Sequence, residues 1–136
     1  MNKIKSGEDS KKFHKNCFAC GKNSPIGLKL KYLLCGNTLT SEFKIPDNYQ
    51  SYDDIVHGGI ISTILDSSMV NLFYKRDGLK LKTAKLNIIF RKSVPINRSF
   101  VVTAIADDNA RHFYKANAQI KIGDTVFAEA EGYFRR

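Results

Sequence analysis

The segment from His57 to Asp66 combines residue types that can hold and activate a carbonyl group. His57, Gly58 and Gly59 directly precede an apolar run, and Asp66 stands nine residues after the histidine. The first N–H groups of a helix have no internal partner, and the helix dipole adds partial positive charge there. A helix that starts at the glycines can therefore bind a carbonyl oxygen or an oxyanion. The alternative is that the glycines only permit a tight turn from loop to helix.

Asp66 interrupts this apolar run and is the candidate for a general base or nucleophile. On a helical wheel it falls beside the main apolar stripe, near Ser62, Thr63 and Val70. A carboxylate is a weak base in water, so this role requires a site enclosed by apolar surface. The ordinary alternative is a carboxylate exposed to solvent on the helix.

These residues need a helix and a sheet to position them, and the hydrophobic pattern predicts both. Apolar residues recur at helical spacing from Ile60 to Phe73, which predicts one helix ending near Asp77 and Gly78. Alternating apolar and polar residues predict about six strands, near residues 28–34, 38–45, 83–90, 99–107, 111–122 and 125–134. The combination predicts an α+β fold in which an antiparallel sheet curls around one long helix.

The length and composition fit a single domain. At 136 residues, 43% of them hydrophobic, the chain can bury a core of its own. Its apolar stretches are far shorter than the roughly 18 residues of a membrane helix, and its polar N-terminus does not resemble a secretory signal. We therefore expect a cytoplasmic protein without membrane association, in which a flexible basic N-terminus (residues 1–12) precedes one domain (residues 13–136).

The cysteines raise the question of a metal site. Cys17 and Cys20 form one CxxC pair, and three cysteines without an export signal are typical of reduced thiols. No second pair follows, so His14 and Cys35 could complete a site only if the fold brought them close. Four ligands at recognisable spacing are the usual signal. The sequence therefore favours the absence of a metal and of any other cofactor.

The formal net charge of +9 suits a polyanionic partner, either nucleic acid or a phosphate-bearing ligand such as coenzyme A. It is equally compatible with lysines that only keep the protein in solution. Aromatic residues are scattered through the expected strands and no recognition helix is evident, which disfavours nucleic acid. Four cations near expected strand ends could bind phosphate, although each is more often simply solvated: Arg91, Lys92, Arg98 and Arg111.

Three segments of the chain resemble the hotdog-fold acyl-CoA thioesterases, particularly the phenylacetate-catabolism (PaaI-like) branch. They are CFACGKNSPIGLKL at residues 17–30, HGGIISTILD at 57–66 and TAKLNIIF at 83–90. The order of two strands, one helix and a further run of strands is also similar. The resemblance implies a homodimer, or a dimer of dimers, in which two sheets pair edge to edge and the active sites lie between subunits.

The resemblance also implies an activity and a role for each candidate residue. The chain would hydrolyse a medium-chain or aromatic acyl-CoA thioester, with coenzyme A as part of the substrate. The amide of Gly58, with Gly59 as neighbour, would polarise the thioester carbonyl, while Asp66 of the other subunit acts as general base or nucleophile. Thr83 stands where similar enzymes carry a serine that orients water, unless it is a solvent-facing strand residue. His57 would support the loop.

The chain also departs from the family pattern. Related sites often carry Asn or Gln six residues before the histidine, where this chain has Ser51, and the adjacent Gln50 could substitute. Many relatives follow the acid with Glu and Ala, whereas Ser67 and Ser68 stand here. The expected substrate-binding residues are therefore Gly59, Gln50, Ser51, Arg91 and Lys92. A second interpretation is a hotdog protein that binds acyl-CoA without turnover, as a sensor or accessory protein.

Overall fold

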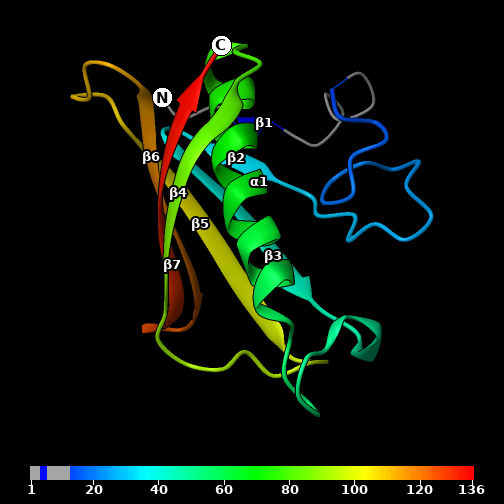
Figure 1. Cartoon of the computed structure of the whole chain (residues 1–136). Helices are drawn as coiled ribbons and strands as arrows, with labels where there is room; N and C mark the ends of the chain where they lie inside the picture. The colour runs from blue at the N-terminus through cyan, green and yellow to red at the C-terminus, as the bar shows by residue number, and fades with distance from the viewer. Residues whose placement is uncertain (1–3, 6–12) are drawn as a thin grey trace.

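The computed structural model describes residues 4–5 and 13–136. In them an antiparallel sheet curves around one long helix, α1 (Gly58–Asp77), which packs against β2 to β7 (Figure 1). The seven strands lie in the order β1-β2-β3-β5-β6-β7-β4. They are β1 (Ile4–Lys5), β2 (Leu33–Cys35), β3 (Thr38–Lys44), β4 (Lys82–Phe90), β5 (Ser99–Asp107), β6 (Tyr114–Ile122) and β7 (Thr125–Arg135). The predicted α+β fold is confirmed, and its six strands correspond to β2 to β7.

The predicted flexible N-terminus, residues 1–12, lies outside the described residues except for the two that form β1. Two predicted strand boundaries are wrong. The strand expected at 28–34 begins at Leu33, because the amides of Leu28 and Leu30 instead donate to the carbonyls of Phe18 and Ala19 (2.8 and 3.0 Å). Residues 111–113 form a bend, so β6 begins at Tyr114.

Helix α1 begins and ends where the sequence predicts. His57 caps its N-terminus, and Gly78 ends it in the left-handed conformation (φ +71°), which glycine adopts without steric penalty. In the last turn Arg76 forms ion pairs with Asp77 and Asp108, each at 2.8 Å. No helix in the described part of the chain is long and apolar enough to span a membrane.

Small residues on the inner face of β6 and β7 let the sheet approach α1 closely. Gly132 is the tightest point of this contact. A Cβ atom added there would lie 2.5 Å from the Phe134 ring and 2.9 Å from the Met69 Sδ. Since Phe134 and Met69 are fully buried, neither has free space into which to move.

Replacing Gly132 with Ala is therefore expected to lower the free energy of unfolding by about 1–3 kcal/mol, because the added methyl overpacks the core. Urea denaturation measures this change. Asn117→Ala, at an exposed position of the neighbouring strand β6, is the control and should shift the free energy by less than about 0.5 kcal/mol. Equal effects of the two substitutions would contradict the close packing at Gly132.

Strand β4 forms one end of the sheet and pairs with β7 alone among the described strands. The exposed fractions of Ile89 and Phe90 are 52% and 54%. A bulge between Thr83 and Lys85 shifts the register near the start of the strand. An open edge with exposed apolar residues is typical of a surface that another chain covers.

Candidate active site

The turn at His57, Gly58 and Gly59 places one unused amide at the start of α1. The Gly59 N–H donates a hydrogen bond to His57 Nδ1 (2.8 Å). This bond fixes Nδ1 of the imidazole as an acceptor and occupies the Gly59 amide. The Gly58 N–H has no acceptor within the helix, and among the described residues no hydrogen bond from it is found. Gly58 thus presents a free donor at the positive end of the helix dipole.

Two pockets adjoin this turn and collect most of the predicted binding residues. One has a volume of about 280 Å³ and includes Ser51, Gly58, Arg91 and Lys92 in its lining, together with the exposed ring of Phe90. The other, of about 360 Å³, is lined by Asn48, Tyr49, Gln50, His57, Gly59 and Ile60. The structure therefore brings the expected catalytic and substrate-binding residues, except Asp66 and Thr83, to the N-terminus of α1, whereas Arg98 and Arg111 line neither pocket.

Several of these side chains already have partners. The Gln50 Oε1 accepts a hydrogen bond from the Asp54 N–H (2.9 Å), so it holds the loop before the helix. The Arg91 guanidinium donates to Glu129 (2.7 Å), and this hydrogen bond raises the pKa of Arg91. Arg91 and Lys92 remain exposed at the pocket rim. Guanidinium carries five N–H donors, so Arg91 can still bind an anion.

Asp66 lies on the helix facing the start of β4. The Thr83 Oγ1 donates a hydrogen bond to the Asp66 Oδ1 (2.6 Å), next to the bulge that follows Thr83. Burial is the largest influence on the pKa of Asp66 and raises it, and the charge of Cys17 raises it further. The hydrogen bond from Thr83 and the charge of His14 lower the pKa, but by less. A half-buried carboxylate with a raised pKa accepts a proton more readily than an ordinary aspartate.

Asp66 and Gly58 do not meet within one chain. Asp66 stands eight residues after Gly58 in the same helix, a separation of about 12 Å along the axis at 1.5 Å per residue. The two groups that could attack and polarise a carbonyl are thus too far apart to act on one bond. Asp66 with Thr83 and Gly58 with its turn thus form two candidate half-sites, which one chain keeps apart.

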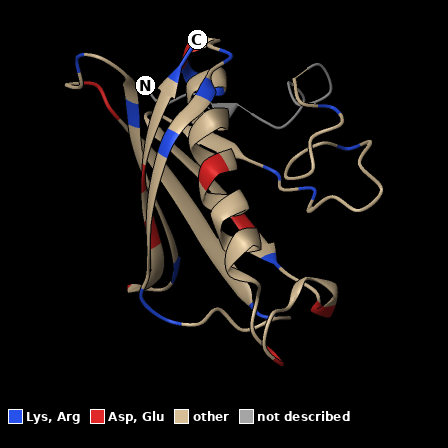
Figure 2. Cartoon of the chain, in the orientation of Figure 1, with Lys and Arg blue, Asp and Glu red and all other residues tan. Residues whose placement is uncertain are grey.

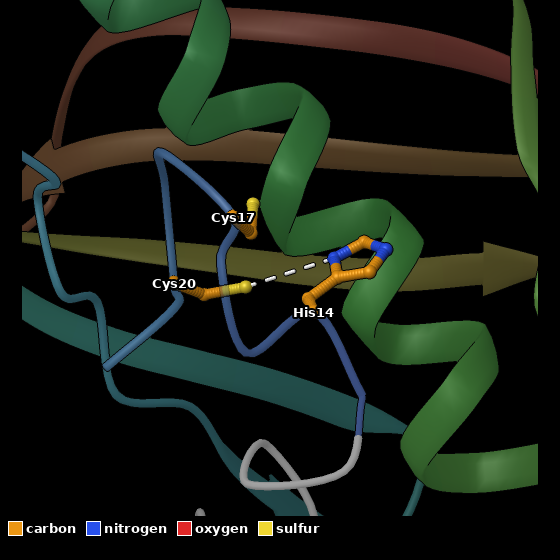
Figure 3. A group of neighbouring side chains, drawn as sticks. All are labelled: His14, Cys17 and Cys20. Atoms are coloured by element: carbon orange, nitrogen blue, oxygen red, sulfur yellow. Dashed lines mark hydrogen bonds between the residues drawn. The ribbon is translucent and has the colours of Figure 1, made fainter. Parts of the chain in front are cut away.

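The structure also brings one of the two candidate further ligands, His14, to the CxxC pair. Ligand atoms of His14, Cys17 and Cys20 lie within 4.8 Å of one another beside α1 (Figure 3). Cys35 lies in β2 and does not belong to this group. In the sequence, this group is indicated only by a histidine three residues before the CxxC pair and by a glycine directly after it.

Comparison with known proteins bears on the fold. No protein-family model matches the sequence, and no curated protein matches it. Among solved structures, a thioesterase superfamily protein superposes with a TM-score of 0.81 at 17% identity, over 90% of this chain, which spans 61% of that protein's length.

Two further structures are similar. Zebrafish thioesterase superfamily member 2 has a TM-score of 0.68 at 18% identity, over 77% of this chain and 79% of that one. The PaaI protein of the Escherichia coli phenylacetic acid degradation operon has a TM-score of 0.67 at 14% identity, over 74% and 76%. Likenesses at such identities establish architecture. The chain therefore has the hotdog fold of the thioesterase superfamily proteins.

Proposed function

We propose that this protein hydrolyses an acyl-CoA thioester at sites formed between two copies of the chain. The observation that carries the proposal is the course of β4, an open edge strand that joins the two half-sites. Its first residues contact Asp66 through Thr83. Its last residue, Phe90, lies beside Gly58, since a Cβ at Gly58 would be 3.7 Å from the Phe90 ring.

Pairing of β4 with β4 of a second copy accounts for the separation of the half-sites. In an antiparallel pair related by a two-fold axis, the start of each strand lies opposite the end of the other. Asp66 of one copy then approaches the Gly58 amide of its partner, and two equivalent sites form. The exposed side chains of Ile89 and Phe90 become covered by the same contact.

In this arrangement each residue has a defined task. Asp66 removes a proton from water, and the resulting hydroxide attacks the thioester carbonyl carbon; direct attack by the carboxylate is the second route. The Gly58 N–H of the partner stabilises the oxyanion. Thr83 orients the carboxylate, and His57 holds the turn by accepting from Gly59. When the carbon–sulfur bond breaks, the proton that Asp66 took from water passes to the sulfur, and coenzyme A leaves as the thiol.

The acyl group and the oligomer belong to the same proposal. We infer a medium-chain or aromatic acyl group from the resemblance of the segments at 17–30, 57–66 and 83–90, and a dimer or dimer of dimers from the open β4 edge. Arg91 and Lys92 at the rim of the Gly58 pocket suit the phosphates of coenzyme A. In Figure 2 basic residues occur on several strands and loops and around the C-terminal end of α1, with acidic residues on other parts of the described chain. The aromatic residues are scattered through the strands, which favours a small phosphate-bearing substrate over nucleic acid.

Mixing of two defective chains tests the shared site. Asp66→Asn and Gly58→Pro each disable one half-site, and thiol release from a panel of acyl-CoA thioesters measures activity. In a mixed dimer one site combines an intact Asp66 with an intact Gly58. Random co-assembly should therefore restore about a quarter of wild-type activity, because half of the dimers are mixed and each holds one intact site.

The two variants purified separately are the control for this experiment. If each is inactive and the co-expressed chains stay inactive although mixed dimers form, the half-sites do not combine across subunits. If the wild type binds acyl-CoA and releases no thiol, the non-catalytic interpretation replaces the proposal.

A further inference from the structure

The loop that precedes β2 gathers three side chains of the kind that bind zinc. The Cys20 Sγ lies 3.7 Å from the His14 Nδ1, and the Cys17 Sγ belongs to the same group, within 4.8 Å of both. Sulfur and nitrogen ligands on a tetrahedral zinc ion lie about 3.5–3.8 Å apart, given bonds of about 2.3 and 2.0 Å. The three ligand atoms therefore need only small movements to share one ion. In the described part of the chain this is the one such group of His, Cys, Asp or Glu.

Both sulfur atoms already receive N–H donors from outside the group. The Ala19 N–H donates to the Cys17 Sγ (3.3 Å). The Asn71 Nδ2 of α1 donates to the Cys20 Sγ (3.7 Å) and also to the Ser67 carbonyl (2.8 Å). Asn71 is almost fully buried. Such donors are characteristic of metal-bound thiolates, whose charge and orientation they hold.

The backbone of the loop keeps the ligands in place. The Cys17 N–H donates to the His14 carbonyl (2.9 Å), and the Gly21 N–H donates to the Cys17 carbonyl (2.8 Å). A Cβ at Gly21 would lie 2.4–2.6 Å from backbone atoms of Cys17, His14 and Lys15, so only glycine fits there. His14 itself adopts φ +55°, which is unfavourable for a residue with a side chain.

We propose that His14, Cys17 and Cys20 form a binding site for one zinc ion. Two thiolates and an imidazole suit zinc and disfavour magnesium or calcium, which prefer oxygen ligands. The two thiolate charges balance the charge of the ion, which allows the site to lie against the buried face of α1. The fourth position falls to a water molecule on the exposed side of His14.

The loop that would hold the ion packs against the middle of α1, where the Asn71 Nδ2 donates to the Cys20 Sγ. Phe13 stacks on Tyr74 of the helix, with ring centroids 3.8 Å apart. The Tyr32 hydroxyl donates to the Ser67 Oγ (2.8 Å), so the helix turn directly after Asp66 is held from the same side. By ordering this loop, the ion would support the side of the helix that carries Asp66 only indirectly, through the loop's contacts with α1. The zinc site does not depend on the proposed thioesterase reaction.

A redox-active disulfide between Cys17 and Cys20 is the competing use of this pair. Both cysteines are free in the structure. A disulfide would not account for the contact of His14 with Cys20. A metal site accounts for the positions of all three side chains and for the two N–H groups that donate to the sulfur atoms. The geometry thus favours the metal.

Titration of the reduced, full-length protein with Co²⁺ tests the proposal, because Co²⁺ bound by thiolates in a tetrahedral site absorbs visible light. We expect one Co²⁺ per chain, displaced by one Zn²⁺, and a rise in the melting temperature with Zn²⁺. Cys17→Ser and Cys20→Ser should weaken binding by at least the ~10–100-fold that follows loss of an outer-shell partner. Cys35→Ser, outside the group, is the matched control and should bind as the wild type does.

Two further measurements keep this test decisive. Circular dichroism establishes that each variant is folded. If the cysteine variants fail to fold, His14→Asn retains both thiols and should still weaken Co²⁺ binding and change its spectrum. Absence of the thiolate–cobalt absorption in wild-type protein whose thiols are reduced would overturn the proposal. Formation of a Cys17–Cys20 disulfide in the absence of any metal binding would instead assign the pair a redox role.

Discussion

Asp66→Asn is expected to lower kcat for thioester hydrolysis by about 10²- to 10⁴-fold, the usual contribution of a general base. Asparagine keeps the size of the side chain and can still accept the hydrogen bond from Thr83, but it cannot remove a proton from water. KM should change little, because the substrate contacts at the Gly58 turn remain. Thiol release from short, medium, long and aromatic acyl-CoA thioesters measures the change.

The same substitution should stabilise the folded protein at neutral pH. Burial raises the pKa of Asp66, so the folded state binds the proton more tightly than the unfolded state does. The stability that this provides is complete below the unfolded pKa and is lost as the pH rises through the folded pKa. At pH 7 the ionised carboxylate therefore destabilises the fold, and the neutral amide removes this effect.

These two readouts separate catalysis from folding. Thermal melts of both proteins at pH 4 and pH 7 should show an advantage of Asp66→Asn that is larger at pH 7. A variant that is folded, dimeric and as active as the wild type would remove Asp66 from the mechanism. If the variant is inactive because it is unfolded, the wild-type protein provides the test instead. Its hydrolysis rate should rise with pH through the raised pKa of Asp66 if this carboxylate acts as the base.

Gly58→Pro is expected to lower kcat by about 10²- to 10³-fold, the effect of losing one oxyanion donor. Proline has no N–H, and the first position of a helix is where it is best tolerated. The preceding residue, His57, has ψ 134°, a conformation that a following proline favours. The substitution therefore removes the donor while the helix can still form.

Gly58→Ala is the matched control, because it retains the N–H. Its Cβ would lie 3.7 Å from the Phe90 ring, an ordinary contact, so kcat should stay close to that of the wild type. Steady-state thiol release on both variants makes the comparison. Similar losses in both would indicate that the space at Gly58 matters and its amide does not.

Much of the fold follows from the sequence because α1 and most strands combine local periodicity with clear ends. Leu28 to Tyr32 shows the limit of this reasoning, since its alternating burial arises without a strand. The backbone of that segment pairs with the cysteine loop. The hydrophobic pattern indicates which side chains are buried, but it does not indicate which groups form hydrogen bonds with the backbone.

The sequence predicts the Gly58 half of the candidate site better than the Asp66 half. The turn at His57 to Gly59 and the following helix form a local unit, so its free amide follows from adjacent residues. The contact between Asp66 and Thr83 joins residues 17 positions apart and depends on the way the sheet folds back on the helix. The grouping of His14 with the CxxC pair depends on the left-handed backbone at His14, which residue types alone do not indicate.

The open edge of β4 has a consequence for newly made chains. In the proposed dimer a second copy covers this edge; before assembly the strand would offer unpaired backbone groups and the exposed side chains of Ile89 and Phe90 to any other extended segment. At low abundance the proposed dimer would form slowly, and the uncovered edge would stay accessible to proteases for longer. If the proposed dimer forms, the strand that joins the two half-sites would also be the surface at which exposed apolar side chains most favour unwanted association.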